Sequence, residues 1–151
     1  MGDRTHCTLM IGGEITEDAF ADLVEALSIE DPDDFDGPTL EEALLTANHV
    51  EFREVNGGAL SDDLDKALIA AGAAFRWSWG DGGSYGPGVT LYDPKTGERG
   101  DYGTLDGEIA LRVADTENPD VLRHANRWLN FEREFPALVV GNDVESGEAA
   151  Q

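Results

Sequence analysis

The sequence predicts a single α+β domain: a mainly antiparallel sheet that contains a β-meander and is covered by about four helices. Several segments place apolar residues at helical spacing, whereas others alternate apolar and polar residues as strands do. Between residues 73 and 113 the strand-like segments follow one another through tight turns, which is typical of a meander. A chain of 151 residues fits one ordinary domain. We place this domain at residues 1–140 and expect residues 141–151 to form an acidic, flexible tail.

The chain begins with a predicted strand and an amphipathic helix. Alternating residues over positions 5–11 predict the strand, and Gly12-Gly13 is the expected end of it. Apolar residues at i, i+3, i+4 and i+7 then predict a helix over residues 16–28, with its inner stripe made by Phe20, Leu23, Val24 and Leu27. Residues 30–38 follow as an acidic loop that contains two prolines.

Two further helices are marked by capping signals. Thr39 and Glu42 form a capping box, which predicts a short helix through about residue 48. After a second strand at residues 50–55, Ser61 caps a helix that Gly72 terminates. We expect the next strand to place three aromatic side chains on one face, in the core: Phe75, Trp77 and Trp79.

The second half predicts the meander, a helix and a final strand. Turn signals at residues 93–97 and 106–107 separate strands that we expect at residues 89–92, 98–104 and 109–113. Asn118-Pro119 supplies an N-cap and a first-turn proline for a helix over residues 120–132. We expect its inward face to consist of Val121, Leu122, Ala125, Trp128 and Leu129. Residues 135–140 suit a short last strand.

The charge of the chain is its most informative property. The formal net charge is -22, from 32 acidic and 10 basic residues. Such a surface repels nucleic acid and anionic membranes, and it attracts strongly basic protein surfaces. High charge is also typical of disorder, but the 40% hydrophobic content is patterned, which argues against disorder for most of the chain. No signal peptide and no stretch of transmembrane length is visible, so we expect a cytoplasmic protein.

The motifs that resemble catalytic or metal sites are incomplete. Residues 82–86 match G-x-S-x-G, but the helix that a nucleophile elbow needs does not follow. The acidic loop fails the EF-hand pattern at its first and last ligand positions. Cys7 lies in a predicted strand as a small apolar residue, and the three histidines lie in three different elements with no ligand spacing. We therefore expect no catalytic residues, no metal and no cofactor, and we do not expect an enzyme.

The acidic residues are concentrated in the first part of the chain. Residues 1–60 hold 15 acidic and two basic residues, whereas residues 61–151 hold 17 and eight. No base occurs between Glu14 and Glu51. We expect this helix–loop–helix segment to bind a partner, together with an aromatic anchor on a glycine-rich loop: Asp18, Asp22, Glu25, Glu30, Asp31, Asp33, Asp34, Asp36, Glu41, Glu42 and Tyr85.

Three function classes stay open at this point. The first is an acidic inhibitor that occupies the basic, nucleic-acid-binding surface of a partner protein, as DNA mimics, anti-CRISPR and antirestriction proteins and nuclease immunity proteins do. The second is a small halophilic domain whose acidity maintains its solvation and whose function is unrelated to the charge. The third is an enzyme or metal-binding domain. The clustering of carboxylates favours the first class, in which the partner is a protein and nucleic acid is not bound directly.

Overall fold

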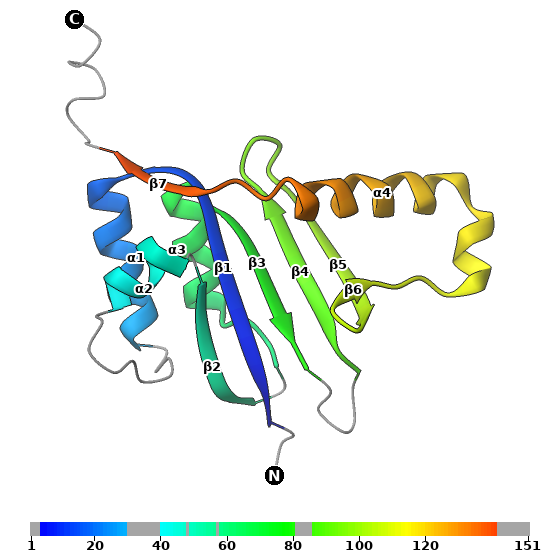
Figure 1. The fold of residues 1–151 in the computed structure, drawn as a ribbon, viewed down its shortest axis with the longest axis horizontal. Helices are drawn as coiled ribbons and strands as arrows, with labels where there is room; N and C mark the ends of the chain where they lie inside the picture. The colour runs from blue at the N-terminus through cyan, green and yellow to red at the C-terminus, as the bar shows by residue number, and fades with distance from the viewer. Residues whose placement is uncertain (1–3, 30–39, 48, 57, 81–85, 142–151) are drawn as a thin grey trace, which may run out of the picture.

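A seven-stranded sheet forms the centre of the computed structural model, which describes residues 4–29, 40–47, 49–56, 58–80 and 86–141 (Figure 1). Its strand order is β2-β1-β3-β4-β5-β6, and β7 pairs with β1. Every pairing is antiparallel except that of β7 with β1, so the α+β class and the meander are confirmed. The elements are β1 (Arg4–Thr16), α1 (Glu17–Ile29), α2 (Leu40–Ala47), β2 (His49–Asn56), α3 (Asp62–Ala71), β3 (Ala74–Trp79), β4 (Gly88–Asp93), β5 (Glu98–Leu105), β6 (Glu108–Ile109), η1 (Val113–Glu117), α4 (Pro119–Arg133) and β7 (Leu138–Gly141).

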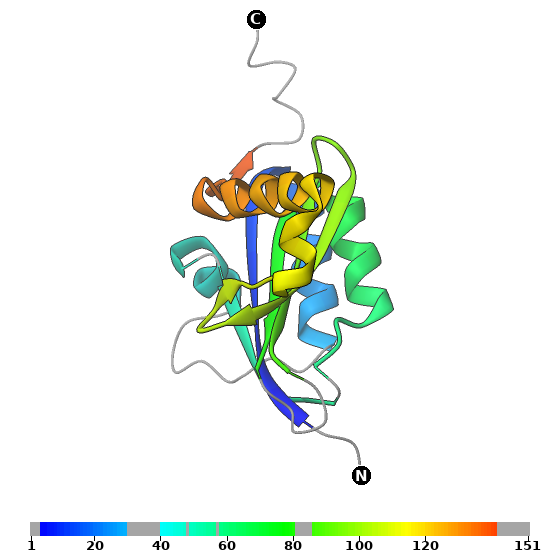
Figure 2. The ribbon, with the colours of Figure 1, turned by 90° about the vertical axis from the view of Figure 1, so that its right-hand side faces the viewer.

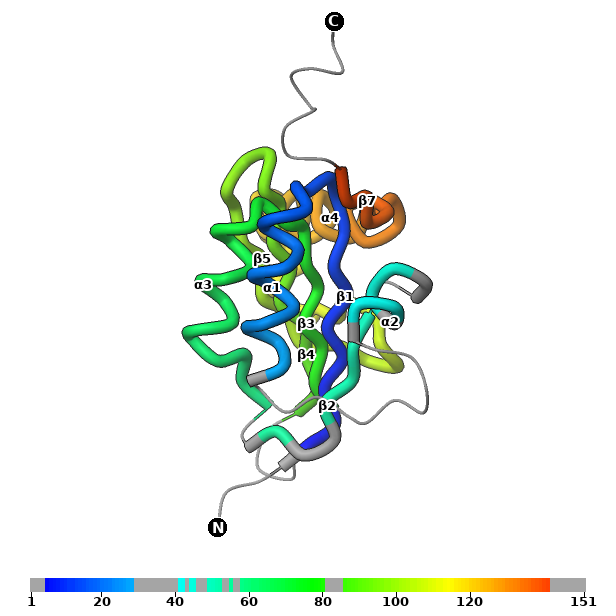
Figure 3. Tube along the Cα trace, turned by 90° about the vertical axis from the view of Figure 1, so that its left-hand side faces the viewer, coloured from blue at the N-terminus to red at the C-terminus, as the bar shows by residue number. Residues whose placement is uncertain are grey.

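Three helices cover the sheet, and the expectation of about four is corrected accordingly. Helices α1 and α3 lie side by side on one face, and α4 lies across the other (Figures 2 and 3). The short helix α2 lies beside the edge strand β2, toward the face that α4 covers (Figure 3). Among the described residues, no helix combines the length and the apolar character that crossing a bilayer requires.

The main core lies between the sheet and the α1–α3 layer. Strand alternation turns Leu9, Phe75 and Trp77 toward these helices, and all three are buried. The helices contribute their own apolar stripes, in which Leu23, Leu27, Leu64 and Leu68 are 0–1% exposed. Aromatic packing adds to this core: Phe75 stacks on Tyr92 with ring centroids 5.3 Å apart. The expected core position of the strand's aromatic residues is therefore confirmed for Phe75 and Trp77.

The helix ends follow the capping residues. Ser61 accepts a hydrogen bond from the Leu64 amide at 3.1 Å, and Gly72 ends α3 with φ of 74°. Asn118 accepts one from the Asp120 amide at 2.9 Å at the start of α4. Because these signals are local, the sequence predicts both starts within a residue or two. Thr39 lies outside the described residues.

A second, smaller core lies under α4. Trp128 packs against Val89 and Leu91, and its indole lies over Gly100 of β5. Of the five side chains expected to face inward, Ala125 and Trp128 are buried, but Leu122 is 37% exposed. The reason is visible in Figure 1, where the N-terminal half of α4 extends beyond the edge of the sheet and has no strand beneath it.

Two strand boundaries differ from the sequence expectation. Strand β1 continues through Gly12-Gly13 to Thr16, because β7 pairs with residues 13–16 and prolongs the ladder. The glycine is needed for this approach, since a β-carbon at Gly12 would collide with the carbonyl oxygen of Pro136. The last meander strand is shorter than expected: β6 covers only Glu108–Ile109, and Val113 begins a 3₁₀ helix with 81% of its surface exposed.

Because Trp128 lies directly over Gly100, we expect that a methyl group at this position lowers the stability of the protein. A β-carbon at Gly100 would lie 2.6 Å from the Trp128 indole nitrogen, so we expect Gly100→Ala to lower the free energy of unfolding by about 1–3 kcal/mol. Gly103 on the same strand is the matched control, because its nearest atom would be 3.9 Å away. Gly103→Ala should change stability by no more than about 0.5 kcal/mol in denaturant titrations. Equal effects at both positions would contradict this packing.

Candidate functional site

The described acidic residues that we expect to bind a partner lie on two helices. Asp18, Asp22 and Glu25 are exposed along α1, on the outer side of the helix layer. Glu41 and Glu42 are exposed on α2, on the other side of the β2 edge (Figure 3). The structure therefore does not bring the acids of α1 and α2 onto one flat face. Six residues of the expected set lie outside the described residues: Glu30, Asp31, Asp33, Asp34, Asp36 and Tyr85.

The α1–α3 layer gathers acidic residues that the sequence stretch did not include. Helix α1 carries four acids and no base, and the neighbouring first turn of α3 adds Asp62, Asp63 and Asp65. Lys66 is the base on α3. Glu17, Asp22 and Glu25 form no ion pair with a described residue, and their side chains are exposed to the solvent. We call the exposed acids of this layer the acidic face: Glu17, Asp18, Asp22, Glu25, Asp62 and Asp63.

Four arginines whose side chains the structure describes lie away from the acidic face and are paired. Arg76 pairs with Glu132 at 2.7 Å, and Arg127 contacts both Asp93 at 3.0 Å and Glu98 at 3.1 Å. On η1 and α4, the pairs Arg112–Asp115 and Arg123–Asp120 form within one helical turn. Because these arginines form local pairs, their positive charge does not neutralise Glu17, Asp22 and Glu25 on α1.

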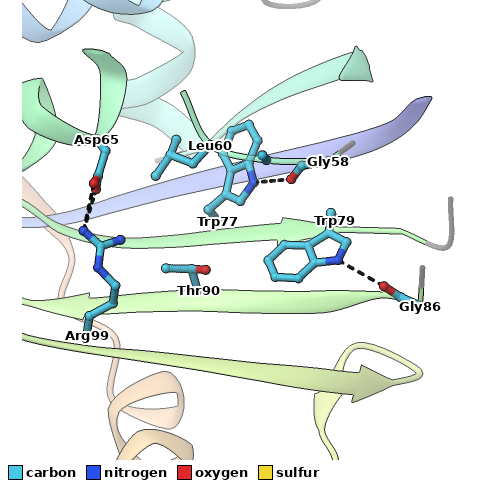
Figure 4. A pocket seen from close by; sticks show the side chains of 9 residues that line it. Gly58, Leu60, Asp65, Trp77, Trp79, Gly86, Thr90 and Arg99 are labelled. Carbon is cyan, nitrogen blue, oxygen red and sulfur yellow. Dashed lines mark hydrogen bonds and ion pairs between the residues drawn. The ribbon is translucent and has the colours of Figure 1, made fainter. Parts of the chain in front are cut away.

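A hollow of about 520 Å³ lies at one end of the α1–α3 side of the sheet, beside the start of α3 (Figure 4). It is bounded by two indole side chains, a threonine, an ion pair and the segment that precedes α3. The lining residues are Gly58, Ala59, Leu60, Asp65, Trp77, Trp79, Gly86, Thr90 and Arg99. This volume is in the range of sites that bind small molecules or a single protruding side chain.

Backbone carbonyls and a glycine fix the two indoles. Trp77 donates its indole hydrogen bond to the Gly58 carbonyl at 2.8 Å, and Trp79 donates to Gly86 at 3.1 Å (Figure 4). The Trp79 ring lies against Gly88 of β4, where a β-carbon would collide with the ring. Trp77 is buried, but Trp79 is only half-buried. Trp79 packs against the main core, as expected, but it is not fully buried as Phe75 and Trp77 are.

Polar groups form the remaining wall of the hollow. A single Arg99 nitrogen donates to both oxygens of Asp65, at 2.7 and 2.9 Å, and the guanidinium lies 5.7 Å from the centre of the Phe75 ring. The Thr90 hydroxyl donates to one oxygen of Asp101 at 2.5 Å. The hollow thus presents an indole face and hydrogen-bonding groups, which suit recognition rather than covalent chemistry.

Two histidines that are distant in sequence meet at one carboxylate. His6 Nε2 lies 3.1 Å from one oxygen of Glu51, and His49 Nε2 lies 3.5 Å from the other. The antiparallel pairing of β1 with β2 produces this cluster, and no spacing in the sequence announces it. Among the described residues, no group of three or more potential ligands has the arrangement of a metal site.

The single cysteine is packed in the core. Cys7 is fully buried in β1, and burial raises the pKa of its thiol from 9.0 to about 12. The thiolate, which is the reactive form, is therefore strongly disfavoured in the folded protein at neutral pH.

Comparison of the chain with protein-family models, with curated proteins and with solved structures finds no match.

Burial of Cys7 predicts a pH-dependent loss of stability. The folded pKa of about 12 exceeds the ordinary value of 9.0, so the unfolded thiol ionises first and stability falls as the pH rises from about 9 toward 12. Denaturant titrations at pH 8 and pH 10.5 should show a larger loss for the native chain than for Cys7→Val. A thiol reagent should modify Cys7 only as fast as the protein unfolds. Rapid labelling of the folded chain at pH 8 would show that the thiol is accessible.

The position of Trp79 depends on Gly88. We expect Gly88→Ala to displace the indole, to shift the tryptophan emission and to lower the free energy of unfolding by about 1–3 kcal/mol. Gly86→Ala is the matched control, since its β-carbon would meet nothing within 4 Å. That variant should keep both the native emission spectrum and the native stability. An unchanged spectrum in Gly88→Ala would mean that the ring does not rest on this residue.

Proposed function

We propose that the protein is an acidic binding protein that occupies a basic, nucleic-acid-binding surface of a partner protein in the cytoplasm. The observation that supports this most is the acidic face, where exposed carboxylates of α1 have no base on their own helix. DNA mimics, anti-CRISPR and antirestriction proteins and nuclease immunity proteins belong to the same functional class. The action is inhibition by occupation, and it requires no catalytic group.

The spacing of the carboxylates sets the linear charge density along α1. At 1.5 Å of rise per residue, Asp18, Asp22 and Glu25 span about 10 Å along α1, or about 5 Å per charge. One strand of duplex DNA carries a phosphate about every 3.4 Å. The row on α1 therefore reaches about two thirds of the linear charge density of a DNA strand. A partner surface that binds phosphates with arginine and lysine finds a similar, rigid row of anions here.

Binding through such a face has a characteristic kinetic signature. Long-range attraction accelerates the encounter of opposite charges, and salt screens it over about 10 Å at 0.1 M ionic strength. Association is therefore expected to be fast at low salt and to slow steeply as salt is added.

Halophilic adaptation is the second candidate, and a specific observation favours it. Exposed acids also occur in the β5–β6 turn and on β6, η1 and α4, for example Asp106, Glu108, Glu117 and Asp120. Acids spread over all sides are what a protein adapted to concentrated salt displays. Folding at low ionic strength separates the two candidates: a halophilic protein unfolds there, whereas an acidic binding protein stays folded and retains its affinity.

Charge reversal on α1 tests the proposed function. We expect Asp22→Lys/Glu25→Lys to reduce capture of a basic, nucleic-acid-handling partner from the native host by about 10-fold or more, mainly through slower association. The matched control, Glu108→Lys/Glu117→Lys, changes the net charge equally but lies outside the acidic face. Capture should be measured at low and high salt, with thermal melts of each variant. Equal loss in both variants, or retention that ignores salt, would contradict the assignment to α1.

A further inference from the structure

The hollow beside Trp79 combines an aromatic surface with hydrogen-bonding groups. We propose that it is the anchor point of the partner interface and receives the guanidinium of one arginine side chain of the basic partner. This inference rests on the proposed function, but it concerns a site that can be probed without the partner.

Trp79 supplies a rigid platform for a planar cation. Its indole is held by the hydrogen bond to the Gly86 carbonyl and rests on Gly88, so the ring cannot turn edge-on to the hollow. Because Trp79 is not fully buried, part of the indole stays open to the hollow. A guanidinium stacks on such a ring with both cation–π and dispersion attraction, and the planar arginine head does so better than the compact lysine ammonium.

The charges around the hollow select a cation. The one positive group of the lining, Arg99, is neutralised by Asp65, and this pair lies at the end of the hollow away from Trp79 (Figure 4). Thr90 lies between the two ends (Figure 4), and its hydroxyl donates a hydrogen bond to one oxygen of Asp101 on β5, which is not itself part of the lining. The Asp101 carboxylate therefore lies one hydrogen bond from the hollow, where its negative charge favours a cation over an anion. Anions are disfavoured here by the net charge of -22.

The position of the hollow connects it to the acidic face. Asp65 lines the hollow and belongs to the first turn of α3, where Asp62 and Asp63 are exposed. A basic surface that covers these acids therefore reaches the rim of the hollow, and an arginine projecting from it can enter. Tryptophan and arginine are the residue types that dominate the binding energy of protein interfaces, so one buried pair would add specificity to an otherwise diffuse attraction.

A titration with a small probe tests the site directly. The probe is N-acetylarginine amide, and the neutral comparator is N-acetylcitrulline amide, which has nearly the same shape. In two-dimensional NMR spectra of the full chain, we expect the arginine probe to shift the Trp79 indole signal and the Thr90 amide signal saturably, with an affinity at least about 10-fold higher than the comparator. Asp101→Asn should weaken probe binding several-fold without affecting the fold, and Trp79→Leu should abolish it.

Asp22→Lys/Glu25→Lys is the control variant, because it alters the acidic face and leaves the hollow intact. We expect it to lose partner capture but to keep most of its affinity for the arginine probe. Equal binding of arginine and citrulline probes, or a response to a neutral monosaccharide instead, would overturn the proposal and indicate a neutral ring-shaped ligand. If the probe fails while salt-sensitive partner capture persists, the anchor is wrong and the proposed function stands. If the probe binds but no basic partner is captured in a salt-sensitive way, the proposed function is wrong and the cation site stands.

Discussion

Arg76 on the central strand β3 connects three parts of the molecule. Its Nε donates to Glu132 near the end of α4 at 2.7 Å, and an Nη donates to the Gly107 carbonyl in the β5–β6 turn at 3.2 Å. Both charged side chains are largely withdrawn from water, at 18% and 14% exposure, so neither can lose its partner without a large cost. The pair therefore holds α4 on one face of the sheet. The other face is left to α1 and α3, and the acidic face depends on that division.

Close approach is the second constraint, and glycine permits it. Gly100 lets the Trp128 indole reach the sheet, and Gly12 lets the chain after α4 pass near β1, so that β7 can pair with it. Gly88 has the same role on the opposite face, where it receives Trp79. Gly12 and Gly100 link elements that are far apart in the chain, whereas Gly88 links the neighbouring strands β3 and β4. Filling one of these positions with a methyl group moves a whole aromatic ring or strand rather than a single side chain.

Local signals explain what the sequence could predict. Helix α3 begins after Ser61 and ends at Gly72 because both signals act within a few residues, and the face of Phe75 and Trp77 follows from a period of two. The extension of β1 past Gly13 could not be predicted, because it depends on a strand more than 120 residues away. The same applies to the meeting of His6 and His49 at Glu51 and to the hollow beside Trp79. In each case the decisive neighbour is supplied by the topology and not by the adjacent sequence.

Repulsion between the acidic side chains of α1 lowers the stability of the folded protein. Glu17 and Asp18 lie in the first turn, where the helix dipole favours a negative charge. Asp22 and Glu25 gain nothing from the dipole, and Glu25 lies toward the C-terminal end, which has no base in its last turn. Like charges one turn apart oppose each other by a few tenths of a kcal/mol, and the arginines that could relieve them are engaged elsewhere. The row of acids therefore lowers the stability of the free protein. A basic surface that binds to the row would relieve this repulsion, and the free energy gained would add to the affinity.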